Sequence, residues 1–184
     1  AVILLAGCGS TPKEDPNSTA AVEKLYADAK SDLDNGSYEP AIKALERVEG
    51  RAAGTLLAQQ ALLDIAYAQH KSRDKAAALA SINRFVKLYP SSPVLDYALY
   101  MRGVVNFNDN MGILSTLSRQ DLSERDQQAS RDAYQAFKPL VDQFPASRYT
   151  PDAQARMHYI VNALAQYEVH VARYYFRRGA YVAA

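Results

Sequence analysis

The side chains that could carry out chemistry in this chain include a single cysteine near its start. Cys8 follows the apolar residues 1–5 and two small residues, Ala6 and Gly7. This order is typical of a bacterial export signal that is cleaved in front of the cysteine. Its thiol then accepts a lipid, so we expect Cys8 to be lipidated and residues 1–7 to be the remnant of a signal peptide. The alternative is an apolar chain end that contains a cysteine by chance.

Three histidines are the remaining candidates for catalysis or metal binding: His70, His158 and His170. The last two are twelve residues apart on one expected helix, a rise of about 18 Å, so they cannot share a metal. The sequence contains no nucleophile elbow, Walker loop or HExxH run. We therefore expect no metal, no cofactor and no enzyme activity.

Composition predicts a helical protein without affinity for nucleic acid. The 184 residues are 48% hydrophobic, include no tryptophan, and carry 21 basic against 20 acidic side chains, a net charge of +1. Such a balance produces no long-range field that attracts nucleic acid, and one cysteine forms no internal disulfide. Residues 9–17 contain two prolines and no apolar side chain, so residues 8–17 should be a lipidated cysteine and its flexible linker. Gly9 stands where enteric bacteria use Asp for inner-membrane retention, which favours the outer membrane.

The rest of the chain reads as pairs of helices. Ser18 or Thr19 can cap a first helix, and Asn35–Gly36 closes it before a second helix that starts at Tyr38. The same pattern returns in residues 55–90 and 93–145, and again from residue 150. The last of these contains no Pro or Gly between Asp152 and Phe176, so we expect one long helix that begins near Pro151.

The spacing of small residues is that of a tetratricopeptide (TPR) repeat. Ala41 and Ala78 lie 37 positions apart, close to the roughly 34 residues of one repeat. The next interval, to Ala133, is 55, which predicts an insertion at 108–126. We therefore expect an all-α, TPR-type α-solenoid of antiparallel helix pairs over residues 18–184, with about three and a half repeats and a truncated end. Its repeats should be 18–50, 55–90, 93–145 and the start of a fourth at 150–184; a generic helical bundle is the alternative.

Several blocks of sequence resemble the BamD/ComL family, TPR lipoproteins of the outer-membrane β-barrel assembly (BAM) complex. They are residues 22–26, 96–103, 132–134, 144–145 and 171–181. The resemblance implies a non-enzymatic scaffold that is anchored by lipid to the periplasmic face of the outer membrane. It also implies a concave groove that receives unfolded outer-membrane precursors, and docking to the BamA periplasmic domains and other BAM lipoproteins. Residues 51–54 depart from the family, because they lack an aromatic-Pro break.

In a TPR solenoid the first helices of successive repeats line the concave groove. A tyrosine suits peptide recognition there, because its rigid ring covers apolar side chains while its hydroxyl forms hydrogen bonds. The repeat register places an aromatic and basic set of side chains on this surface: Tyr26, Lys30, Gln60, Leu63, Tyr67, His70, Lys71, Tyr97, Tyr100 and Phe107. Lys30 and Lys71 could meet a terminal carboxylate. The alternative is that these tyrosines are core residues.

The end of the long fourth helix carries a cluster of charge, Arg173, Arg177 and Arg178 with Glu168. The resemblance implies that contact with BamA begins here, whereas the alternative is a solvated face held by salt bridges.

Two other function classes remain open. A pilotin-like TPR lipoprotein that escorts a secretin to the outer membrane would share the lipidation signal and the repeats, but it should lack the block at 171–181. A periplasmic enzyme with accessory TPRs is disfavoured by the missing site chemistry.

Overall fold

The computed structural model describes residue 15, residues 18–107 and residues 124–182. Within these ranges it contains seven α-helices and no strand, so the all-α prediction is confirmed. The helices are α1 (Thr19–Asp34), α2 (Tyr38–Arg51), α3 (Leu56–Lys71), α4 (Lys75–Leu88), α5 (Leu95–Asn106), α7 (Glu124–Gln143) and α8 (Thr150–Arg177).

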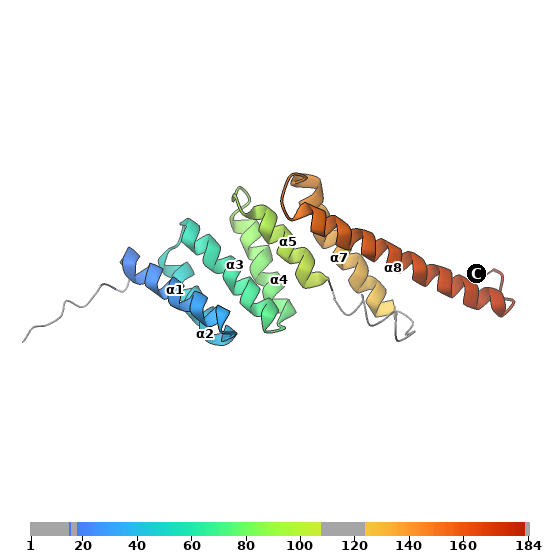
Figure 1. The fold of residues 1–184 in the computed structure, drawn as a ribbon, viewed down its shortest axis with the longest axis horizontal. Coiled ribbons are helices and arrows are strands. Elements are labelled where there is room, and N and C mark those ends of the chain that lie inside the picture. Colours follow the sequence, from blue (N-terminus) through green and yellow to red (C-terminus); the bar gives the residue numbers. More distant parts are fainter. Residues whose placement is uncertain (1–14, 16–17, 108–123, 183–184) are drawn as a thin grey trace, which may run out of the picture.

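The described helices form a two-layered stack of antiparallel pairs. Each packs against its neighbours in this sequence, from α1 against α2 through to α7 against α8. In Figure 1 helices α1, α3, α5 and α8 lie in the nearer layer, and α2, α4 and α7 lie behind them. The structure therefore has the helical repeat arrangement that the TPR pattern predicted. We call the surface formed by α1, α3, α5 and α8 the first-helix face.

Local sequence determines where the helices begin. The side chains of Ser18, Thr55 and Asp74 each accept a hydrogen bond from a backbone N–H in the first turn, at 3.2, 3.3 and 2.9 Å. These caps satisfy donors that a helix start otherwise leaves unpaired. Pro151 lies in the first turn of α8, where its missing N–H is not needed.

Glycines close two of the turns. Gly36 between α1 and α2 has φ of +76°, and Gly54 between α2 and α3 has φ of +82°. Both values lie in the left-handed region that side chains disfavour. Gly54 belongs to the segment without an aromatic-Pro break, so this first inter-repeat turn is made by a glycine.

Small and large side chains alternate in the core. Ala29, Ala41 and Ala61 are fully buried and let α1, α2 and α3 approach closely, while Leu45 fills the space between them. A second cluster joins α3, α4, α5, α7 and α8 around Phe137. Each pair thus buries its apolar surface against the next pair, as in other repeat proteins.

The long helix α8 leaves the stack part-way along its length. Its buried residues are Thr150, Ala153 and Ile160, and its second half is largely exposed. In Figure 1 this half extends beyond α7. The expected insertion covers residues 108–126, of which 108–123 lie outside the described residues. Helix α7 begins at Glu124, within the range that was expected for the insertion.

Candidate functional site

The first-helix face contains a polar network centred on Asp64 of α3. Asp64 is only 7% exposed and accepts hydrogen bonds from Tyr26 Oη at 2.7 Å and Lys30 Nζ at 3.3 Å, both on α1. Gln60, one turn earlier on α3, donates to the same carboxylate at 3.4 Å. The network therefore connects the first helices of two successive pairs and contains three of the expected groove residues.

Two tyrosines of this face are held in their protonated form. Burial raises the pKa of Tyr26, and its hydrogen bond to Asp64 raises it further. Burial also raises the pKa of Tyr97, from 10.0 to about 12, with smaller contributions from Tyr149 and Asp64. Both hydroxyls therefore keep their protons to a higher pH than a free tyrosine does.

A second network joins α5 to α8. Tyr100 Oη donates to Asp152 Oδ2 at 2.8 Å, and Arg156 Nε donates to the same oxygen at 2.7 Å. Burial by itself would raise the pKa of Asp152, but the hydrogen bonds from Arg156 and Tyr100 lower it below its ordinary value. The ring of Tyr100 stacks on that of Tyr149 with centroids 4.9 Å apart. Like the network around Asp64, this one contains a cation, a tyrosine on the first helix of one pair, and an aspartate on the first helix of the following pair.

Phe107, at the end of α5, lies in an aromatic cluster with a cation. Its ring meets Phe137 and Tyr159 edge-on at 6.4 and 6.2 Å, and the guanidinium of Arg156 lies 5.0 Å from its centroid. Tyr97 packs against Tyr149 at 5.3 Å. Three of the expected groove residues, Tyr97, Tyr100 and Phe107, thus meet side chains at the junction of α5 and α8.

The remaining expected groove residues differ in exposure. Tyr67 is 37% exposed, and Lys71 Nζ lies 5.6 Å from its ring centroid. His70 is half-buried. Leu63 is 1% exposed and belongs to the core around Phe137, so its expected place on an open groove surface is wrong. The reason is that α3 packs against α2, α4 and α5, which buries more than one of its faces.

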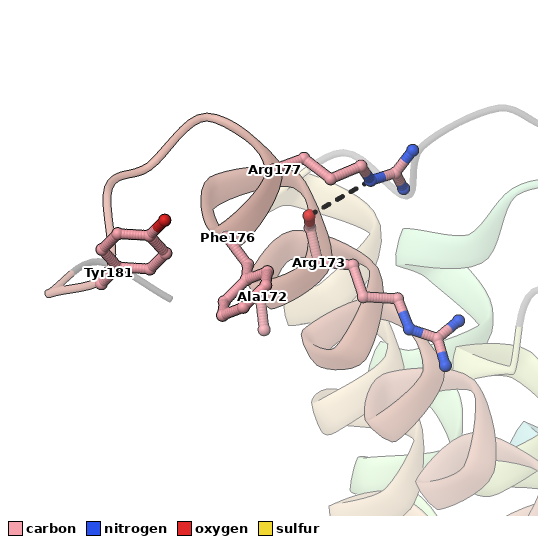
Figure 2. Close-up of a pocket in the computed structure, with 5 residues that line it drawn as sticks. All are labelled: Ala172, Arg173, Phe176, Arg177 and Tyr181. Atoms are coloured by element: carbon pink, nitrogen blue, oxygen red, sulfur yellow. Dashed lines mark hydrogen bonds between the residues drawn. The ribbon is translucent and has the colours of Figure 1, made fainter.

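The end of α8 carries apolar and basic side chains together. A shallow pocket is lined by Ala172, Arg173, Phe176, Arg177 and Tyr181. In Figure 2 the ring of Tyr181 faces Phe176 and Ala172, while the side chains of Arg173 and Arg177 extend to the other side. The rings of Phe176 and Tyr181 lie 5.3 Å apart, and both are well exposed. Arg178 lies over the ring of Tyr174 at 4.9 Å.

The described residues contain side chains suited to binding a partner. Among them, no cluster of three or more His, Cys, Asp or Glu side chains is arranged to hold a metal ion. In the same part of the chain, no helix is both long and apolar enough to span a membrane. The arrangement can offer aromatic rings, hydrogen-bonding groups and cations to a partner.

Comparison with known proteins identifies the family. Residues 18–184 match the family model YfiO, described as outer membrane lipoprotein. The outer membrane protein assembly factor BamD of Neisseria meningitidis serogroup B is 51% identical over 186 residues, which cover 99% of this chain and 70% of that protein. The chain belongs to this family.

Other members of the YfiO family carry the same name at lower identity. The BamD protein of Neisseria gonorrhoeae is 47% identical over 99% of this chain and 70% of its own length. That of Vibrio cholerae is 36% identical over 100% of this chain and 76% of its own length. The resemblance to the BamD/ComL family that the sequence blocks indicated is therefore confirmed.

The family description, outer membrane lipoprotein, agrees with the lipidation motif. Cys8 itself lies outside the described residues, so its lipid remains a prediction.

Sequence reasoning missed the charged and aromatic side chains that contact the expected groove residues of this YfiO family member. Asp64, Asp152, Arg156, Tyr149 and Tyr159 all contact expected groove residues. The one signal for Asp64 was a lone carboxylate inside the apolar stretch of residues 61–68.

Proposed function

We propose that this chain is a non-enzymatic assembly factor for outer-membrane proteins, within the β-barrel assembly machinery. The observation that carries the proposal is the 51% identity, over nearly all of this chain, to a protein named outer membrane protein assembly factor BamD. All three relatives described above carry that name. This supports barrel assembly over the escort of a secretin.

The first-helix face is the proposed receptor for unfolded precursors. An extended chain would lie across α1, α3 and α5 and contact the rings of Tyr26, Tyr67 and Tyr97. Rigid aromatic rings suit this role because they cover apolar side chains at a low cost in conformational entropy. The half-buried and exposed positions of these rings support the proposal.

The end of α8 is the proposed docking site for the BamA periplasmic domains and other BAM lipoproteins. Arg173, Arg177 and Arg178 would provide charge, and Phe176 and Tyr181 would provide apolar contact. The proposal is supported by the exposure of these rings, 64% for Phe176 and 68% for Tyr181. Large exposed apolar side chains that cluster commonly mark an interaction surface.

A lipid on Cys8 would hold this scaffold at the periplasmic face of the outer membrane. Replacing Cys8 by Ala should release the protein into the soluble periplasmic fraction. Retention of the variant in the membrane fraction would contradict a lipid anchor.

Peptide binding tests the receptor face. We expect Tyr67→Ala to weaken binding of a barrel-protein C-terminal peptide by about tenfold, the loss typical of an aromatic interface residue. Fluorescence anisotropy with a labelled peptide measures the affinity. Tyr134→Ala on α7, in the second layer, is the matched control and should change the affinity less than twofold. Equal affinities for the wild type and both variants would contradict the proposed face.

Affinity purification from outer membranes tests the complex. Recovery of the barrel-assembly subunits supports the proposal, and recovery of a secretin alone would contradict it. The triple substitution of Arg173, Arg177 and Arg178 by Ala should reduce recovery of the BamA protein while leaving the helical circular dichroism signal unchanged.

A further inference from the structure

Asp64 is unusual among the described side chains because it is an acidic group inside the core of the stack. Of the buried residues in this part of the chain, it is the only one with an ionisable side chain. The related Asp152 has a side chain that is 50% exposed. Burying a carboxylate is unfavourable unless its oxygens are hydrogen-bonded, so its position needs an explanation beyond packing.

The hydrogen bonds to Asp64 come from three side chains of the first-helix face. Tyr26 and Lys30 lie one turn apart on α1, and Gln60 lies one turn before Asp64 on α3. A carboxylate offers about four acceptor positions, so these three donors occupy most of them.

This arrangement determines what the α1–α3 part of the first-helix face can offer. The Tyr26 hydroxyl gives its hydrogen to Asp64, which leaves its ring and its oxygen lone pairs for a ligand. The ammonium of Lys30, with a side chain 41% exposed, is paired with the carboxylate at 3.3 Å. The positive charge of Lys30 is therefore largely balanced before any ligand arrives.

Lys71 is placed differently at the other end of α3. Its ammonium lies over the ring of Tyr67, and among the described residues no carboxylate forms a salt bridge with it. The two lysines that sequence analysis treated alike are therefore not equivalent.

We infer that Asp64 is a positioning residue that sets the charge selectivity of the first-helix face, by pairing with Lys30 and orienting Tyr26. The α1–α3 part of the face then accepts uncharged, extended peptide through aromatic and backbone contacts, and it does not bind a terminal carboxylate at Lys30. This inference rests on the proposed function, since it concerns the peptide that the face receives.

The binding experiment uses one barrel-protein C-terminal peptide made in two forms, with a free carboxylate and with a C-terminal amide. Asp64→Asn keeps the size of the side chain and one acceptor oxygen, but it removes the charge and replaces the second oxygen by an NH₂ donor. We expect this variant to favour the carboxylate form about fivefold more than the wild type does, because one freed cation then faces the ligand.

The double variant Asp64→Asn/Lys30→Met should lose this added preference, because the freed ammonium is gone. A purely structural role for Asp64 would weaken both peptide forms equally and leave their ratio unchanged. An unchanged ratio in Asp64→Asn would therefore overturn the inference.

A second readout needs no peptide. Acetic anhydride modifies free amines. Mass spectrometry of peptides, obtained by digesting the full chain after modification, reports the rate at each lysine. Lys30 should react more slowly than the exposed Lys24 and Lys43 in the wild type, and Asp64→Asn should raise the rate at Lys30 alone. Asp152→Asn is the matched control, because it removes the carboxylate of the other network. It should leave the reaction rate at Lys30 as low as in the wild type.

The two readouts separate the possible failures. An unchanged rate at Lys30 in Asp64→Asn overturns the inference whether or not peptides bind. A second outcome is that the wild type binds neither peptide form, while Lys30 reacts slowly in the wild type and faster in Asp64→Asn. That result contradicts the proposed function and the selectivity that depends on it. Equal acceleration at Lys24, Lys30 and Lys43 would mean general loosening of the fold in Asp64→Asn, and would overturn a specific pairing.

Discussion

Gly103 of α5 is the residue at which side-chain size matters most for the α5–α7 contact. A Cβ atom built at this position would overlap the ring of Phe137. The ring is fully buried and cannot swing out into solvent. Close approach of the two helices therefore requires the absence of a side chain at residue 103.

Gly103→Ala should destabilise the protein by about 1–3 kcal/mol, the usual effect of overpacking a core. Urea unfolding followed by circular dichroism measures the free energy of unfolding. Gly50→Ala is the control, because an added Cβ there meets no atom within 4 Å. That variant should be neutral or more stable by up to about 1 kcal/mol, since Ala favours a helix more than Gly does. Equal effects of the two substitutions would contradict the close contact.

The ionisation of Tyr97 makes a prediction for alkaline pH. Its pKa rises from 10.0 to about 12 on folding, chiefly through burial. The folded state thus holds the proton more tightly than the unfolded state does. The resulting stabilisation is fully present below pH 10 and is lost as pH rises towards 12.

Measurement of unfolding free energy between pH 9 and 12 checks this, with Tyr97→Phe for comparison. The wild type should lose stability more steeply than the variant over that range. Parallel curves would show that the hydroxyl of Tyr97 does not contribute.

Among the elements, α8 combines a packed half and an unpacked half in one helix. Ile160 is 1% exposed, whereas Phe176, four turns later, is 64% exposed. Ile160→Ala should therefore cost about 2–5 kcal/mol of folding free energy. Phe176→Ala should change it by less than about 0.5 kcal/mol. Thermal or urea unfolding of the two variants tests this, and a large loss for Phe176→Ala would mean that the end of α8 packs more tightly than described.

The helices were predictable because their signals are local. Ser18 caps α1, Gly36 ends it with a positive φ, and Pro151 opens α8; each acts within a few residues of itself. The polar network of Asp64 was not predictable, because Tyr26 lies 38 residues away in sequence. The repeat register assigns each helix one groove face. Helix α3, however, packs against α2, α4 and α5 and also contacts α1 through Asp64, which is why the burial of Leu63 was not predicted.

The whole molecule is a stack in which contacts link neighbouring helices, so stability should be distributed by region. Leu45 belongs to the cluster of α1, α2 and α3, and Leu140 belongs to the cluster that includes α7 and α8. Both side chains are fully buried.

Each Leu→Ala substitution should lower the free energy of unfolding by about 2–5 kcal/mol. The two substitutions should, however, loosen different regions of the stack. Hydrogen exchange measured by mass spectrometry should speed up mainly in α1 and α2 for Leu45→Ala, and mainly in α7 and α8 for Leu140→Ala. Identical exchange profiles for the two variants would indicate one cooperative unit instead of a stack.

The projecting half of α8 also has a mechanical consequence. From Ile160 to Arg177 it reaches about 25 Å past its last buried residue, at 1.5 Å per residue. A rigid rod of that length acts as a lever arm, so a tilt of about 10° at its base displaces its tip by roughly 4 Å. Movements too slight to disturb the packing of Ile160 are thereby amplified into a displacement as large as an atom's diameter at Arg177.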